Sequence, residues 1–153
     1  MTLGKIGNSI LAGFCGTLAH TLLMALKSTL GLLPEFQPYD DLQRGLSGLL
    51  GAAVSPGMAW AVTLLNGAVI WGFAFGKIYR FLPGKNPTQK GVVFGLCAWA
   101  VMGLVFFPLL GRGLFARGLG LSFAPAALML AMLLAYSVTM SLAYHRLNAR
   151  PRS

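Results

Sequence analysis

The chain has 153 residues, of which 56% are hydrophobic and only 10% are charged. A soluble domain carries about a quarter charged residues, and a soluble fold this apolar would expose large apolar patches, which monomers avoid. The mean hydropathy of +0.72 points the same way. The composition therefore excludes an ordinary soluble domain and predicts an all-α integral membrane protein with one domain, residues 1–153.

The net charge of +9 does not indicate a nucleic-acid partner, because the 12 Lys and Arg residues lie at the ends of the apolar runs, where positive charge sets the orientation of membrane spans. With four spans, one side of the membrane holds both termini and eight cations: Lys5, Lys77, Arg80, Lys85, Lys90, Arg146, Arg150 and Arg152. The other side holds all three acidic residues and four cations: Lys27, Arg44, Arg112 and Arg117. This excess predicts that both termini face the cytoplasm.

Four apolar runs predict spans at about residues 6–30, 57–80, 91–110 and 122–145, each able to cross a hydrocarbon core about 30 Å thick. The expected fold is a four-helix bundle. Between the first two spans, four leucines recur at helical spacing among polar residues: Leu42, Leu46, Leu49 and Leu50. They predict an amphipathic helix over about residues 40–52 that lies in the extracytoplasmic interface. A plain connecting loop is the alternative.

One face of the first span collects small and polar residues at steps of three and four. This face includes Gly13, Gly16, Thr17 and Met24. Such a stripe is typical of a helix–helix contact in lipid, so we expect the other spans to pack against it. Lys27 lies near the far end of the same face and is expected to extend toward the membrane surface.

His20 is the only ionisable side chain that the sequence places deep in the membrane, and such a group is a functional candidate by default. Counting about 1.5 Å per residue from the span centres puts His20 and Asn66 at the same depth, to within about one turn. We therefore predict that these two side chains face each other in the bundle interior. A hydrogen-bonded structural histidine is the alternative.

No residue set predicts catalysis or a metal site. Cys15 and Cys97 lie inside apolar runs and form no Cys-x-x-Cys or Cys/His cluster. His20 and His145 are about 18 Å apart along the membrane normal, too far to share one haem iron. A haem with His20 as its only histidine ligand stays an alternative. We expect no enzyme activity, no metal and no cofactor.

Two tryptophans, Trp71 and Trp99, fall near mid-membrane, away from the interfacial belt where tryptophan is enriched. A deep tryptophan needs a partner for its N–H group. We interpret both as candidate contacts with a ligand, such as a quinone, a pigment or a lipid tail, or with a partner subunit. Packing inside the bundle is the alternative.

The two outer loops carry opposite charges. Glu35, Asp40 and Asp41 follow the first span, and Arg112 and Arg117 lie between the third and fourth spans. Ion pairs between these loops would clasp the two halves of the chain. Exposed pairs contribute about 0–1 kcal/mol each, so the predicted clasp fixes geometry more than stability. A charged gate is the alternative.

Several short motifs resemble a family of small four-span bacterial inner-membrane proteins of unknown function. The motifs are Ala12-Gly13-Phe14, Leu30-Gly31-Leu32-Leu33-Pro34, Ile70-Trp71-Gly72, Tyr79-Arg80-Phe81-Leu82-Pro83-Gly84 and Phe107-Pro108-Leu109-Leu110-Gly111. The resemblance covers most of the chain and implies a multi-pass protein of the bacterial inner membrane. Because the family has no established activity, it implies no site residues.

The small size, the few polar interior groups and the small-residue faces favour a non-catalytic accessory or assembly subunit. It would pack against a larger membrane complex, respiratory or photosynthetic. A small oligomeric transporter or channel with a polar path at His20 and Asn66 is the second hypothesis, and a haem- or quinone-binding electron carrier is the third. The expected partners are the lipid bilayer and either a larger complex or further copies of the chain.

Overall fold

The computed structural model describes residues 3–149, which include four helices long and apolar enough to cross a membrane. Spans one and four are single helices, α1 (Leu3–Thr29) and α7 (Ala124–Ala149). Span two joins α3 (Pro56–Leu65), η1 (Asn66–Trp71) and α4 (Gly72–Ile78), and span three joins α5 (Pro87–Val101), η2 (Met102–Phe106) and α6 (Phe107–Leu109). The described residues contain no strand, so the predicted all-α membrane bundle is confirmed. The span boundaries lie within about one helical turn of those expected.

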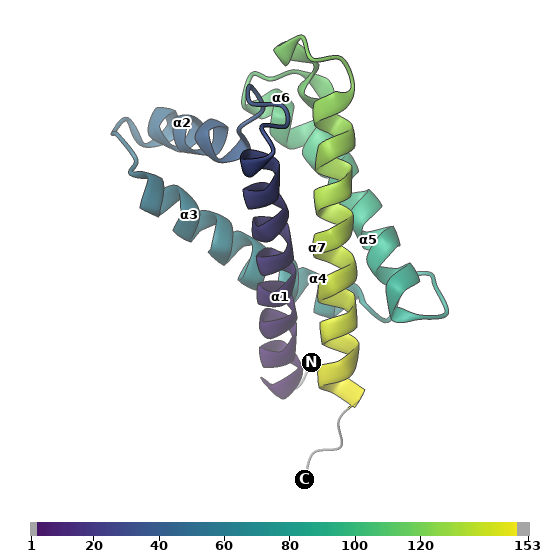
Figure 1. Cartoon of the computed structure of the whole chain (residues 1–153). Helices are drawn as coiled ribbons and strands as arrows, with labels where there is room; N and C mark the ends of the chain where they lie inside the picture. Colours follow the sequence, from purple (N-terminus) through teal and green to yellow (C-terminus); the bar gives the residue numbers. More distant parts are fainter. Residues whose placement is uncertain (1–2, 150–153) are drawn as a thin grey trace.

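Two shorter helices lie at the end of the bundle that we call the outer end, opposite the start of α1 and the end of α7, the inner end (Figure 1). The helix α2 (Pro38–Leu50) connects spans one and two, and the 3-10 helix η3 (Leu114–Leu119) connects spans three and four. A helix therefore occupies the position predicted for the amphipathic segment. Gly51 ends α2 with a φ of 63°, a left-handed conformation that glycine adopts without steric cost.

The sequence marks the starts of spans two and three clearly. The Ser55 side chain accepts a hydrogen bond from the backbone N–H of Met58 at 3.3 Å, and the Asn86 side chain accepts one from that of Gln89 at 2.8 Å. A proline follows each capping residue. Capping oxygens satisfy free backbone donors and proline suits the first helical position, so both helices begin where local chemistry favours it.

Spans one and four form the centre of the bundle, where α1 lies beside α7 (Figure 1). The inner part of span two packs on α1, and α5 packs on α7. Glycines permit these close approaches. A Cβ atom at Gly13 would lie 2.5 Å from the Ala68 carbonyl oxygen, and one at Gly16 would lie 2.8 Å from the Tyr136 carbonyl oxygen. The helices therefore meet backbone to backbone, as small residues allow in lipid.

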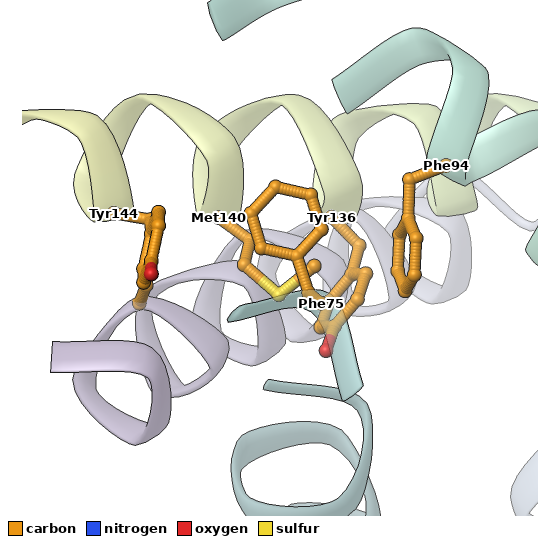
Figure 2. Close-up of a cluster of buried hydrophobic side chains, with 6 residues drawn as sticks. Phe75, Phe94, Tyr136, Met140 and Tyr144 are labelled. Atoms are coloured by element: carbon orange, nitrogen blue, oxygen red, sulfur yellow. The ribbon is translucent and has the colours of Figure 1, made fainter. Parts of the chain in front are cut away.

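All four spans contribute to one apolar cluster near the inner end, shown in Figure 2. Its buried members are Ala12, Phe75, Phe94, Tyr136, Met140 and Tyr144. The ring of Phe75 makes edge-on contacts with Phe94 and Tyr144, with centroids 5.0 and 5.8 Å apart. Edge-to-face geometry is the favoured arrangement of aromatic pairs, so this cluster joins the four spans in a defined way.

A second apolar cluster lies toward the outer end and consists of Phe36, Phe107, Ala116 and Met129. Its members come from the loop after α1, from span three, from η3 and from span four. No residue of span two belongs to this cluster or to the partly buried residues around it. Apart from the buried Ala59, span two therefore contributes to the core at the inner end.

The outer half of span two leaves the bundle. Figure 1 shows α3 diverging from α1 toward the outer end, with α2 above it. The contacts agree, because η1 and α4 pack on α1, whereas α3 packs on α2. The closest contact of span two with α1 includes the π-helical segment η1, and π-helical turns frequently occur at functional sites.

Span three contains a π-helical segment of its own, for which the sequence offers a reason. The N–H of Phe107 bonds to the carbonyl oxygen of Met102, five residues earlier. Pro108 follows directly, and a proline inside a regular α-helix clashes with the carbonyl four residues before it. The wider π turn places the distortion at residues 102–106, one turn before the proline at which a bend is expected.

We predict that Gly13→Ala destabilises the bundle, because the new Cβ would meet the backbone of span two, which cannot move aside as a side chain can. Overpacking of this kind costs about 1–3 kcal/mol. Gly7→Ala on the same helix is the matched control, because nothing lies within 4 Å of a Cβ there. Thermal unfolding in detergent measures both variants, and an equal effect on their melting temperatures would contradict the prediction.

Candidate functional site

Three aromatic side chains from three helices meet where span two leaves the bundle. The rings of His20 in α1 and Tyr39 in α2 lie edge to face, with centroids 6.5 Å apart. The ring of Tyr39 stacks on that of Trp60 in α3 at 4.3 Å, with an angle of 21° between the planes. This aromatic row, His20, Tyr39 and Trp60, connects α1 to the divergent α3 through α2.

The Tyr39 hydroxyl is buried and has no hydrogen-bond partner among residues 3–149. Burial raises the pKa of Tyr39 above that of a free tyrosine. The phenol is protonated at neutral pH, and the Thr21 side chain on α1 acts on its pKa in the opposite direction to burial. A buried polar atom without a hydrogen-bond partner costs about 1–3 kcal/mol.

Local hydrogen bonds hold α2 against the start of span two. The Gln43 side chain donates to the carbonyl oxygen of Val54 at 2.6 Å. The Ser47 hydroxyl accepts from the N–H of the same residue at 3.0 Å and donates to the Gln43 carbonyl oxygen. Both backbone groups of Val54 are thereby bound by α2. The link between α2 and α3 is consequently a fixed turn.

A buried carboxylate ties α2 to the loop after span three. The side chain of Asp41 is 3% exposed and that of Arg112 is 25% exposed, and the two form an ion pair, with the Arg112 Nε 3.1 Å from the Asp41 Oδ1. Arg44, one turn further along α2, binds the same oxygen at 2.5 Å. The second carboxylate oxygen is buried without a partner in the described chain.

The structure therefore forms one part of the predicted outer clasp. Asp41 and Arg112 pair, whereas Glu35, Asp40 and Arg117 are exposed and form no ion pair within residues 3–149. The expectation of an exposed, weak clasp needs correction, because the Asp41 carboxylate is buried. Two arginines, Arg112 and Arg44, share this carboxylate, and a buried charge depends on such partners more than an exposed one does.

Lys27 reaches the outer loop after α1 but is not exposed there. Its side chain is buried, and the ammonium donates to the carbonyl oxygen of Phe36. The chain makes this possible because it turns back after α1 at Gly31, whose φ is 63°, and covers the end of the helix. The cation thus satisfies a backbone acceptor in the outer apolar cluster.

The remaining sequence candidates lie inside the bundle. Thr17, Met24 and both glycines of the expected packing face are buried, with Gly13 against span two and Gly16 against span four. Trp71 packs edge-on against Phe94 with centroids 5.8 Å apart. Trp99 donates its indole N–H to the carbonyl oxygen of Ala126 at 2.8 Å. Each tryptophan is half-buried and engaged by the chain's own residues.

The expected contact between His20 and Asn66 is not made. His20 is half-buried beside Tyr39, whereas Asn66 is exposed on the outside of span two. Span two meets α1 at Gly67, whose added Cβ would contact the Thr17 side chain. Three residues further along α1, at His20, span two has already diverged. The two side chains therefore lie on different faces of the bundle.

The aromatic row was not predicted from the sequence, because His20, Tyr39 and Trp60 lie in three separate segments that no spacing relates. The one sequence feature that could have indicated the row is Tyr39, which follows Pro38 at the start of a helix.

Two surface hollows of about 400 and 410 Å³ lie away from the aromatic row, one beside Arg117 and Phe123 and the other beside the Pro83 turn. Within residues 3–149, no three His, Cys, Asp or Glu side chains lie close enough to hold a metal ion.

We predict that Arg112→Ala lowers the free energy of unfolding by about 1.5–3 kcal/mol, because it removes the Arg112 hydrogen bonds to the buried Asp41 carboxylate, which keeps its pairing with Arg44. Arg117→Ala, in the same loop but exposed and unpaired in the described chain, is the control and is expected to change stability by less than about 0.5 kcal/mol. Denaturant unfolding in detergent micelles compares the two variants. Equal losses of stability would mean that the ion pair does not hold the loops together.

The comparisons with known proteins agree with this architecture. The model of a family described as a family of unknown function, DUF6789, matches residues 3–153. No curated protein and no solved structure matches the chain. The resemblance to a small membrane family of unknown function is thereby confirmed. This multi-pass membrane protein, with its four apolar helices, belongs to the DUF6789 family.

Proposed function

We propose that this protein is a non-catalytic accessory or assembly subunit that packs against a larger membrane complex. The observation that carries the proposal is the divergent outer half of span two. The helix α3 contacts α2 and the π segment below it, whereas the rest of span two packs on α1. Of the four spans, span two is the least buried against the rest of the described chain.

Specific contacts maintain the divergence of α3. The buried pair of Asp41 and Arg112 fixes α2 to the outer end of the bundle. The stacked rings of Tyr39 and Trp60 then fix α3 to α2, and the bonds to Val54 fix the turn between them. These contacts form a bracket, which we define as α2 with its attachments to α3 and Arg112. The bracket holds span two apart from span one.

The bracket presents a helix surface that suits another protein. Met58, Leu64 and Leu65 are exposed on α3, and no other span of the described chain covers them. Helices associate in lipid through close packing of such surfaces. A partner helix that lay along α3 would contact a rigid, preorganised surface, which lowers the entropic cost of binding.

The proposed setting is the bacterial inner membrane with both termini in the cytoplasm. The support is the distribution of charge along the chain, since eight cations lie on the side of the termini and four on the other side together with all the acids. Cytoplasmic loops carry an excess of Lys and Arg. The bracket and its buried carboxylate would then lie on the extracytoplasmic side.

A transport path through His20 and Asn66 receives no support from the geometry, because the two side chains lie on different faces. A haem would rely on His20 as its only histidine, and the ring of this residue already packs against Tyr39. The subunit hypothesis therefore agrees best with the observed contacts.

The test is purification of the tagged chain from its native membrane in a mild detergent, with identification of co-eluting proteins and a visible spectrum. We expect other membrane polypeptides in stoichiometric amounts and no haem absorbance. Leu64→Ala on α3 is expected to lower their recovery several-fold. Leu104→Ala, an equally apolar exposed change on span three, is the matched control. A chain that elutes without other polypeptides would contradict the proposal, and a Soret band would replace it with the haem hypothesis.

A further inference from the structure

The side chain of Asn66 is exposed and unpaired in the middle of a membrane span. Asn66 makes no side-chain hydrogen bond with any residue between 3 and 149, and the nearest polar side chain along the helix, Thr63, donates instead to the Ala59 carbonyl oxygen at 2.9 Å. Span two runs from Pro56 to Ile78. Asn66 therefore lies about 15 Å from the start of the span, at the centre of a core about 30 Å thick.

An amide exposed to hydrocarbon at this depth is costly, because lipid tails offer neither donor nor acceptor and each unsatisfied group costs several kcal/mol. Asparagine side chains inside a membrane commonly form hydrogen bonds across helices instead. The described chain offers none at this surface. A second polypeptide at this position would supply the missing partner.

The face around Asn66 has the form of a helix contact. In the inner half of span two, Ala68, Gly72 and Phe75 are buried against the bundle. At about 100° per residue, the opposite side of the helix carries Asn66, Ile70, Phe73 and Lys77 at spacings of four, three and four. All four side chains are exposed. We call this stripe the Asn66 face.

We propose that the Asn66 face binds the same face of a second copy of this chain, in a parallel dimer with a two-fold axis along the membrane normal. Such an axis brings each residue near it to the same depth as its own copy. An asparagine amide carries two donors and an acceptor, so the two Asn66 side chains can each donate to and accept from the other. Ile70 and Phe73 then pack beside the amide pair.

This contact leaves the proposed role of the outer half of span two untouched. The Asn66 face belongs to η1 and α4, whereas the surface presented by the bracket belongs to α3. Self-association and docking on a larger complex can therefore fail or succeed separately. The cross-linking experiment below tests self-association alone.

The experiment is disulfide cross-linking in membranes, in a Cys15→Ala, Cys97→Ala background that removes both native thiols. Ile70→Cys, at a position 62% exposed on the Asn66 face, is expected to give a cross-linked dimer of this chain. Val101→Cys, at a position 46% exposed on span three, is the matched control and is expected to give none. No dimer with Ile70→Cys, or equal cross-linking at both positions, would overturn the proposal. A cross-link to a different polypeptide would also overturn it.

The role of the amide is tested by Asn66→Leu in the detergent-purified chain, with the dimer dissociation constant measured by dilution. Interhelical hydrogen bonds in lipid typically change association by about three- to twentyfold, and we expect a weakening of this size. Asn66→Gln, which keeps the amide, is expected to recover most of the affinity. If Asn66→Leu dimerises as well as the parent chain, the amide pair is refuted. Circular dichroism and the melting temperature establish that each variant is folded.

Discussion

The backbone contact between span one and the π-helical segment of span two determines how the rest of the chain is arranged. At Gly13 the two helices meet so closely that a single methyl group does not fit. The hydroxyl of Tyr136 holds the same segment from span four, by donating to the Gly67 carbonyl oxygen at 2.6 Å. Because η1 is fixed from two sides, the α3 helix that precedes it can leave the bundle in a defined direction.

The outer end depends on a different kind of interaction, a buried ion pair. In the low-polarity surroundings of Asp41, the desolvation of two charges offsets much of their attraction, so such a pair contributes less to net stability than to the choice of one arrangement. Here the arrangement chosen is the position of α2 relative to Arg112. The stacking of Tyr39 on Trp60 then fixes the start of span two relative to α2. The inner end is therefore fixed by packing and the outer end by specific polar and aromatic contacts.

The sequence predicted the features that depend on length, composition and spacing: four spans, the amphipathic helix and the small-residue face of span one. It did not predict those that depend on rotation about a helix axis. Depth placed His20 and Asn66 at one level, but Ala68, Gly72 and Gly76 form a small-residue stripe opposite Asn66, and this spacing already indicates that the amide points outward. The choice of Asp41 among three acids, and the burial of Lys27, depend on how the loops fold back, which local sequence does not specify.

The Asn66 amide points away from span one because the geometry of the same helix points Ala68 and Gly72 toward it. Adjacent helical residues differ by about 100° in direction, so a segment that turns Ala68 and Gly72 toward span one must turn Asn66 and Ile70 away from it. Asn66 could be withdrawn from the hydrocarbon only if the span rotated, and rotation would replace the glycines with bulky side chains at the contact with α1. The intramolecular packing therefore enforces the exposure of Asn66 and leaves its amide without a partner in the described chain.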